Sequence, residues 1–218
     1  MKIDRDFAEK FLTCIEDYDS YGVHLLFNEW WAGAPEDAMK VYCQTILNHP
    51  EQGPLAREGF LADPITLSDL DAFGSGTLGE AYRQFIVDNG LEENLGAGYR
   101  ALHDEIERSG KLTRMPDVIR YKVLRGFQTH DFHHILTGYP PTPYGELSLQ
   151  AFGFAQQNYP YAGMWISVIT AHVTLLRPGM IDDVMTSITD GWRLGKAAES
   201  IQFVKFEHML DQQVDELR

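Results

Sequence analysis

The chain has few cysteines, few positive charges and no long apolar run, and each shortage argues against a class of protein. Only two cysteines, Cys14 and Cys43, occur in 218 residues. Two cysteines allow neither a disulfide framework nor a zinc site built from paired Cys-x-x-Cys motifs, and a reducing cytosol is the expected compartment. The 18 lysines and arginines face 32 acidic residues, for a formal charge of -14. Nucleic acid is therefore not the expected partner, because phosphate binding depends on clustered basic side chains.

The longest uncharged stretch runs from Leu147 to Leu176, and its most apolar part is too short for a membrane span. That part, Tyr161–Leu176, has 16 residues, whereas a spanning helix needs about 20. It is either a buried core helix or the wall of a pocket for a long apolar ligand. The N-terminal residues Met1–Asp6 lack the apolar region of a signal peptide and are too acidic for a transit peptide. We expect a cytoplasmic protein, with peripheral contact to the inner face of a membrane as the alternative location.

Helical periodicity runs through almost every segment, and no segment alternates convincingly with a period of two. The sequence therefore predicts an all-α fold, with one multi-helix domain over residues 1–218. Residues 1–65 form its N-terminal helices and loop. Thr77 is expected to cap a helix, with Glu80 at the spacing of a capping box. We expect helices at 4–18, 25–33, 36–48, 78–89, 93–108, 116–137, 144–158, 160–176, 180–198 and 207–217, and a loop rich in Pro and Gly at 49–65.

A local reversal of charge lies in the middle of the chain, in the basic segment between Arg108 and Arg125. Six basic residues face one acid, Asp117, in this segment; they are Arg108, Lys111, Arg114, Arg120, Lys122 and Arg125. The segment is either a solvated helix face or a contact for an anion or a membrane surface. Among these residues Arg120 and Arg125 are candidates for binding substrate, because a guanidinium pairs bidentately with a carboxylate or a phosphate.

The densest group of potential metal ligands lies in Thr129–His134, within the helix expected at 116–137. Since each helical residue turns about 100°, His130 and His134 share one face, one turn apart. Asp131 flanks that face, while His133 points to the other side. Two imidazoles at i and i+4 are the arrangement by which one helix offers two ligands to a metal. The alternative is a pair of surface histidines that suit the dipole of a helix end.

A Pro- and Gly-rich turn after this helix adds a carboxylate to the group. Residues 137–145 cannot continue the helix, so the next helix folds back as an αα-hairpin. Glu146, in the first turn of that second helix, then comes level with His134. The predicted metal ligands are His130, Asp131, His134 and Glu146, and Asp131 is alternatively a general base or an orienting residue. Such a set suits a divalent metal, with zinc as the first candidate and iron(II) as the second.

The run His130-Asp131-x-x-His134, followed after eleven residues by Glu146, resembles the signature of a known family. It is similar to the coenzyme Q (ubiquinone) biosynthesis proteins called coenzyme Q biosynthesis protein four. The similarity covers residues 70–218, and residues 1–60 match only loosely. Further matches are Arg125, Gly76-Thr77-Leu78-Gly79-x-Ala81-Tyr82, Leu136-Thr137-Gly138, Gly145, Gly191-Trp192-x-x-Gly195-x-x-Ala198, Phe206-Glu207 and Leu217-Arg218.

This resemblance implies an all-helical protein, often dimeric, with a metal at the motif. It also implies a role in ubiquinone synthesis, at the membrane periphery and in association with other enzymes of that pathway. The implied reaction is oxidative decarboxylation of a polyprenylated hydroxybenzoate-type ring, in which hydroxyl replaces carboxylate. The competing function is a non-catalytic organiser that binds isoprenoid lipid. A phosphohydrolase of the HD type is a weaker third candidate, because no persuasive partners for a two-metal centre are present.

Overall fold

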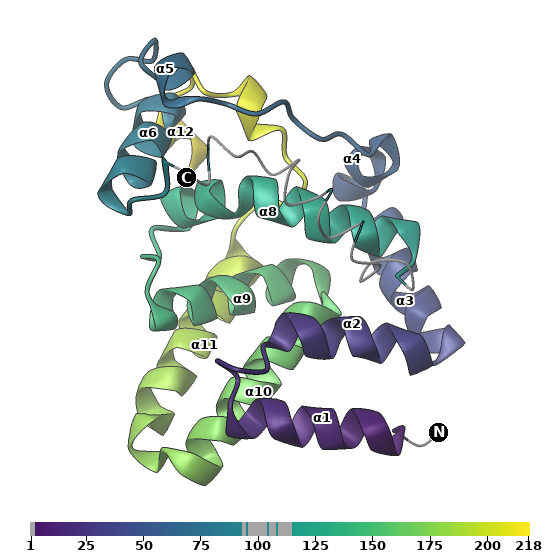
Figure 1. Ribbon diagram of the computed structural model, residues 1–218. Coiled ribbons are helices and arrows are strands. Elements are labelled where there is room, and N and C mark those ends of the chain that lie inside the picture. Colours follow the sequence, from purple (N-terminus) through teal and green to yellow (C-terminus); the bar gives the residue numbers. More distant parts are fainter. Residues whose placement is uncertain (1–2, 93–94, 96–103, 105–107, 109–114) are drawn as a thin grey trace.

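A computed structural model describes residues 3–92, 95, 104, 108 and 115–218. Within these residues all regular structure is helical and no strand occurs, which confirms the all-α prediction (Figure 1). The α-helices are α1 (Arg5–Glu16), α2 (Val23–Gly33), α3 (Glu36–Leu47), α4 (Gln52–Glu58), α5 (Leu67–Leu70), α6 (Leu78–Asp88), α8 (Asp117–Thr137), α9 (Pro143–Gln157), α10 (Pro160–Leu176), α11 (Ile181–Ala197) and α12 (Val214–Leu217). Two short 3₁₀ helices are η1 (Pro178–Met180) and η2 (Phe206–His208).

Most of the expected helices are present, with ends that differ by only a few residues. The predicted cap at Thr77 is also confirmed, because its hydroxyl accepts from the backbone N–H of Glu80 at 3.3 Å. The Glu80 carboxylate accepts in turn from the N–H of Gly76 at 2.6 Å. The helix expected at 93–108 lies outside the described residues.

The loop expected over the whole of residues 49–65 is wrong, because α4 lies inside it. Its Gly and Pro are at the ends of a short helix rather than in an irregular segment. Pro54 lies in the first turn of α4, where a missing N–H costs nothing. Gly59 ends the helix in the left-handed conformation at φ 65°, the usual place of a terminal glycine.

The continuous helix expected at 207–217 is also wrong. Only η2 and α12 form there, because the backbone between them bonds to the start of α6. The N–H groups of Leu78 and Gly79 donate to the carbonyls of Gln212 and Leu210, each at 2.8 Å. Val214 donates to the carbonyl of Gly76 at 2.9 Å. First-turn N–H groups of a helix have no partner within it, so the C-terminal segment supplies carbonyls to α6.

Helix α8 crosses the middle of the molecule and divides the core. In Figure 1 it lies between α5, α6 and the C-terminal segment on one side and α9 on the other. Its C-terminal half packs Phe132 and Leu136 against α6 and η2. Its N-terminal half packs Ile119 and Leu124 against α2, α3 and α4. Both ends of α8 are therefore held by burial of apolar surface, which contributes roughly 25 cal/mol per Å².

Helices α9 and α11 approach each other closely through two glycines. A Cβ atom on Gly191 would lie 2.0 Å from the carbonyl oxygen of Ser148. One on Gly195 would lie 2.5 Å from that of Phe152. Both contacts are far shorter than van der Waals distance, so only glycine allows this approach. The two glycines of the Gly-x-x-x-Gly pair in α11 thus position α9, which carries Glu146.

A buried ion pair ties α8 to η2. Arg125 is 0% exposed, and its two Nη atoms donate to the two carboxylate oxygens of Glu207 at 2.7 and 2.8 Å. The guanidinium also donates to Gln128 at 3.0 Å and to the carbonyl of Val204 at 2.6 Å. Lys122, another residue of the basic segment, is buried and donates to the amide of Gln202. Both side chains therefore form contacts inside the protein and are not available to an external anion.

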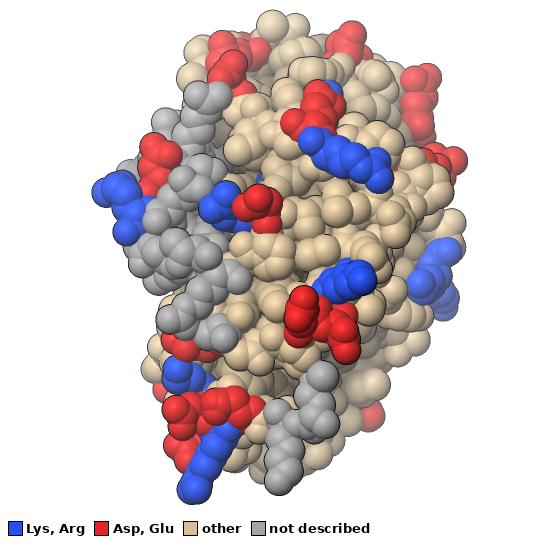
Figure 2. All heavy atoms as spheres, turned by 90° about the vertical axis from the view of Figure 1, so that its right-hand side faces the viewer, with Lys and Arg blue, Asp and Glu red and all other residues tan. Residues whose placement is uncertain are grey.

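Charges on the surface lie largely beside charges of the opposite sign. Figure 2 shows one face on which described acidic and basic side chains neighbour one another, with a wide uncharged area between them. Ion pairs include Lys10 with Glu29 at 2.7 Å and Arg83 with Asp71 at 2.6 Å. Exposed pairs of this kind contribute little to stability, at most about 1 kcal/mol. The described part of this face offers no continuous basic patch for a polyanion.

The uncharged stretch 147–176 forms α9 and α10 and has two environments. Leu147, Phe152 and Val168 are buried in the core. The opposite side of α10 forms an apolar groove of about 600 Å³ with α11, lined by Ile166, Ser167, Thr170, Ala171, Thr174, Leu175, Met185 and Ile188. No helix among the described residues has the length and apolarity needed to cross a membrane.

The glycine contact predicts a large penalty for one added methyl group. Gly191→Ala places a Cβ against the backbone of α9 and should lower the free energy of unfolding by about 1–3 kcal/mol, as overpacking does. Gly126→Ala is the matched control, because nothing lies within 4 Å of the added Cβ in α8. It should stabilise by up to about 1 kcal/mol through helix propensity. Urea denaturation followed by circular dichroism measures both, and equal effects would contradict this account of the contact.

Because the ion pair is buried, replacing one partner should lower the free energy of unfolding more than replacing both. Arg125→Met leaves the Glu207 carboxylate without its partner and should cost about 3–5 kcal/mol. The double change Arg125→Met with Glu207→Leu should recover most of this loss, because no unpaired buried charge remains. Denaturant titration of the two single variants and the double variant gives the coupling energy. A loss below about 1 kcal/mol in the single variants would show that the pair is not needed.

Candidate metal centre

The turn between α8 and α9 brings the two helices face to face. Gly138 ends α8 in the left-handed conformation at φ 75°, which glycine adopts without steric cost. The Thr142 hydroxyl caps α9 by accepting from the N–H of Gly145 at 3.3 Å, and Pro143 occupies the first helical position. A Cβ on Gly145 would lie 1.9 Å from the carbonyl oxygen of Pro140. The turn therefore requires glycine directly before Glu146.

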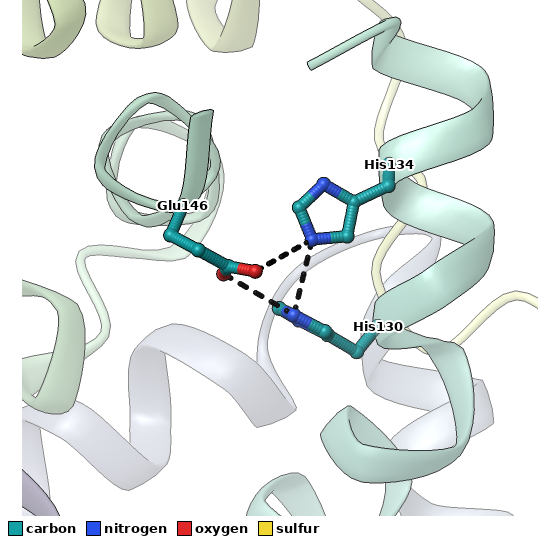
Figure 3. A group of neighbouring side chains, drawn as sticks. All are labelled: His130, His134 and Glu146. Atoms are coloured by element: carbon teal, nitrogen blue, oxygen red, sulfur yellow. Dashed lines mark hydrogen bonds and ion pairs between the residues drawn. The ribbon is translucent and has the colours of Figure 1, made fainter. Parts of the chain in front are cut away.

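Three predicted ligands meet across this hairpin (Figure 3). The Nε2 atoms of His130 and His134 are 3.2 Å apart. The Glu146 carboxylate reaches both rings, with Oε1 3.0 Å from Nε2 of His134 and Oε2 3.3 Å from Nε2 of His130. The predicted hairpin and its pairing of His134 with Glu146 are thus present in the structure. Their ligand atoms form the cluster that could hold a metal ion among the described residues.

The spacing of these atoms fits a metal ion. Zn–N bonds of about 2.0–2.1 Å and tetrahedral angles place neighbouring ligand atoms about 3.3 Å apart. The observed separations of 3.0–3.3 Å agree with this value. Two neutral imidazoles and a carboxylate would otherwise point lone pairs at one another. A cation at the centre satisfies all three groups at once, whereas one proton can satisfy only two.

His134 is held firmly by its surroundings. Its side chain is 1% exposed, and its Nδ1 lies 2.8 Å from the carbonyl oxygen of Tyr139. A carbonyl can only accept, so Nδ1 carries a proton, and Nε2 is the nitrogen that faces His130 and Glu146 and would bind a metal. The ring also stacks on Phe85 of α6, with centroids 5.6 Å apart and planes inclined by 19°. The orientation of His134 is therefore fixed before any metal binds.

His130 and Glu146 form the open side of the cluster, with side chains 37% and 30% exposed. Burial alone would raise the pKa of Glu146, but hydrogen bonds from the two histidines lower it to about 2. For His130 burial opposes ionisation, while the hydrogen bond to Glu146 and the charges of Glu146 and Asp131 raise its pKa above 6.5. Without a metal, the carboxylate is ionised at neutral pH and a proton is favoured on His130.

Asp131 and His133 lie beside the cluster but outside it. Asp131 is 8% exposed and is not among the residues whose ligand atoms meet. The short aspartate side chain leaves α8 about 100° around the helix from His130. It acts on the site through the charge that raises the pKa of His130. His133 faces the other way, as predicted, and contacts Phe206 with ring centroids 5.9 Å apart.

Neither of the two candidate substrate-binding arginines belongs to the cluster. Arg125 is fully buried and paired with Glu207, so its position does not support contact with a ligand. Arg120 is partly exposed and pairs with Asp117 at 3.2 Å. It lies ten residues before His130, about 15 Å along the helix axis. One small carboxylate cannot contact both Arg120 and the metal site.

Two groups that contact His134, the Tyr139 carbonyl and the Phe85 ring, were not predicted from the sequence. The Tyr139 carbonyl is a backbone group, and its approach to His134 depends on the conformation of the turn. The only available signal was that the turn begins directly after the helix of His134. Phe85 lies in a different helix, and no spacing pattern connects it with the histidines. Its contact follows from the packing of α6 on α8, which also pairs Tyr82 with Phe132 at 4.3 Å.

The electrostatics predict how zinc binding depends on pH. A metal displaces the proton from His130, so affinity should fall about tenfold per pH unit below the raised pKa of this residue. Glu146, with its pKa of about 2, adds no further dependence between about pH 8 and pH 5. Competition with a chromophoric chelator over this range gives the slope. An affinity that does not change with pH would exclude His130 as a ligand.

The variant Glu146→Gln separates the two contributions of the carboxylate. It should bind zinc more weakly at every pH, because a neutral amide replaces a charged ligand. The fall in zinc affinity on acidification should also begin at a lower pH, since the Glu146 charge that helps to raise the pKa of His130 is gone. The same chelator titration tests both effects. Unchanged affinity in Glu146→Gln would remove the carboxylate from the ligand set.

Comparison with solved structures shows the same fold in another protein. A crystal structure from Nostoc punctiforme PCC 73102, provisionally described as a ubiquinone biosynthesis protein, superposes with a TM-score of 0.71. The match covers 100% of this chain and 97% of that one at 22% identity. At this identity the similarity establishes the fold alone.

Comparison of sequences identifies the family. The "Ubiquinone biosynthesis protein COQ4 homolog, mitochondrial" of Nematostella vectensis is 26% identical over 186 residues, 80% of this chain and 82% of that protein. The Botryotinia fuckeliana protein "coq4, mitochondrial" is 26% identical over 71% of this chain, which spans only 50% of the fungal protein. The model of the family described as "Coenzyme Q (ubiquinone) biosynthesis protein Coq4" matches residues 57–218. The chain therefore belongs to the Coq4 family of ubiquinone biosynthesis proteins.

Proposed function

We propose that this protein is a metal-dependent oxidative decarboxylase that acts on a polyprenylated hydroxybenzoate-type ring in ubiquinone biosynthesis. The observation that carries the proposal is the convergence of His130, His134 and Glu146 on one partly open point. Family membership supports the pathway, and the donor set supports the chemistry. Three protein ligands leave coordination positions for substrate or water, as in catalytic rather than structural sites.

The ligands of the proposed site suit zinc as the first candidate metal and iron(II) as the second. Two imidazoles and one carboxylate are ligands of catalytic zinc sites and of the facial triad of non-haem iron oxygenases. When bound, zinc would supply a Lewis acid, and iron would additionally supply a site for dioxygen chemistry. Overall, one carbon–carbon bond breaks to release CO₂ and one ring carbon–oxygen bond forms. Dioxygen supplies that oxygen, and a two-electron reductant takes the second oxygen atom to water.

The chain's own residues orient the reactants around this point. His134 holds the inner side of the site, while His130 and Glu146 face its open side. Phe127, one turn before His130 on α8, is 38% exposed. It is the apolar surface against which an aromatic ring would rest. Tyr161 of α10 is close enough to Glu146 to interact with its charge. Burial is the main cause that raises the pKa of the Tyr161 phenol, and the negative charge of Glu146 raises it further.

Asp131 keeps a role as a base or an orienting group in this proposal. Asp131 is a buried residue of α8, the helix that also carries His130, and its charge helps to raise the pKa of His130. A negative charge there makes His130 a stronger donor to a cation, as carboxylates beside ligating histidines do. Arg120 is the remaining candidate for an anionic group of the substrate. Because it lies about 15 Å from His130 along α8, it would meet a distant anion such as a phosphate, not the ring carboxylate.

The apolar groove between α10 and α11 supports a second function. It has a volume of about 600 Å³ and an apolar lining that includes Ile166, Leu175 and Met185. Leu175 and Met185 are 67% and 43% exposed. Exposed apolar side chains beside a groove favour contact with an apolar partner. The corresponding function is that of an organiser, which binds isoprenoid lipid and other ubiquinone biosynthesis enzymes as a homodimer at a membrane surface.

Single-turnover assays under oxygen separate the two functions. Supplied with a two-electron reductant, the metal-loaded protein should convert a prenylated hydroxybenzoate to CO₂ and the prenylated dihydroxybenzene in which hydroxyl replaces carboxylate. His134→Ala and Glu146→Gln should each lower the rate by more than about 100-fold, since changes outside the ligand shell alone cost 10–100-fold. His208→Ala is the control, because His208 is exposed and lies in η2. Tight lipid binding without conversion, or full activity in folded His134→Ala, would contradict the decarboxylase proposal.

A further inference from the structure

We propose that Phe85 is a positioning residue of the metal centre, which fixes the plane of the His134 ring. The inference rests on the metal centre of the proposed function and goes beyond its ligand set. Phe85 belongs to α6, outside the ligand hairpin. Its ring lies 5.6 Å from the imidazole of His134, with only 19° between the planes. This is an offset stack within the range of favourable aromatic pairs.

The stack supplies a restraint that the hydrogen bond alone does not. A histidine ring turns readily about its Cβ–Cγ bond, because the energy wells of this torsion are broad. The Tyr139 carbonyl lies 2.8 Å from Nδ1, and Oε1 of Glu146 lies 3.0 Å from Nε2. Both contacts are at the edge of the ring, so the ring can still tilt about the line that joins its two nitrogens. Phe85 lies nearly parallel to the ring and opposes the tilt, so Nε2 keeps its aim at Glu146.

The other histidine ligand has a different environment. His130 is 37% exposed. Its described ring contact is with His134, edge to face at 86° and 4.7 Å. His134, by contrast, is 1% exposed and has both a stacking partner and a hydrogen-bonded carbonyl. The two histidines therefore have different roles: His134 is the buried ligand with a fixed orientation, and His130 is the ligand on the accessible side.

Phe85 itself rests on a rigid support. Helix α6 is capped at its start by Thr77, and its first N–H groups donate to carbonyls of the C-terminal segment. One turn before Phe85, Tyr82 packs against Phe132 of α8 with ring centroids 4.3 Å apart. These contacts fix α6 against the helix that carries both histidines. A ring on α6 can thus transmit this fixed geometry to His134.

A simple packing role makes a different prediction from a positioning role. Phe85 is a partly buried member of the core cluster around α6 and α8. If it only fills space, any apolar residue of similar size would serve, and its loss would lower stability alone. Leucine keeps most of the apolar contact but has no flat face to lie against the imidazole. Tyrosine keeps the face.

The test measures metal binding by the metal-stripped full chain. Zinc affinity is determined by competition with a chromophoric chelator for wild type, Phe85→Leu, Phe85→Tyr and Phe73→Leu. Phe73 is the matched control, because it is a partly buried phenylalanine of the same core cluster and packs against Gly79 at the start of α6. Phe85→Leu should weaken zinc binding about 10-fold or more, as loss of outer contacts to ligating histidines does. Phe85→Tyr should restore it, and Phe73→Leu should change it less than about twofold.

Cobalt(II) supplies a readout that stability does not affect. Its visible absorption reports ligand geometry, so Phe85→Leu should shift or broaden the band while Phe73→Leu and Phe85→Tyr keep the wild-type spectrum. Wild-type affinity and spectrum in folded Phe85→Leu would overturn the inference and leave the proposed function intact. Equal weakening in Phe73→Leu and Phe85→Leu would assign the effect to packing and also overturn it. A wild type that binds neither metal would overturn both proposals.

Discussion

The close turn between α8 and α9 is the constraint on which the site depends. Gly138 ends the first helix at φ 75°, and Gly145 leaves no Cβ to collide with the Pro140 carbonyl. Glu146, in the first turn of α9, therefore lies level with His134, and three potential ligand atoms from a short stretch of sequence meet. The same turn presents the Tyr139 carbonyl to His134. One local feature thus sets both the ligands and the orientation of the inner histidine.

The rest of the fold holds this hairpin in place. Many residues that carry the family resemblance act at a distance from the ligands. Arg125 pairs with Glu207 and fixes η2 on α8, and Arg218 donates to the carbonyl of Ile135 at 2.8 Å near the end of α8. Gly191 allows α11 to press on α9. The residues of the family pattern therefore include the hairpin of His130, His134 and Glu146 and the contacts that keep its two helices in register.

Local patterns in the sequence predicted the fold class, most helices and the three side chains that meet in the cluster. His130 and His134 follow from helical spacing, and Glu146 follows from the Pro- and Gly-rich turn. Contacts that depend on tertiary structure could not be predicted this way. Arg125 looked like a residue for an external anion, since its partner Glu207 is 82 residues away. The segment 207–217 looked helical, yet its carbonyls bond to the start of α6. The position of Asp131 outside the cluster depends on side-chain direction, and Phe85 reaches His134 only through helix packing.

The central claim is that the hairpin holds one catalytic metal ion, with a fixed inner ligand and an open outer side. Elemental analysis of the purified full chain tests it most directly, with wild type and Glu146→Gln prepared identically. We expect about one equivalent of zinc or iron per wild-type chain, and less than about a tenth of that in Glu146→Gln, because the site loses its only charged ligand. Equal metal content in the two proteins, whether full or absent, would contradict it.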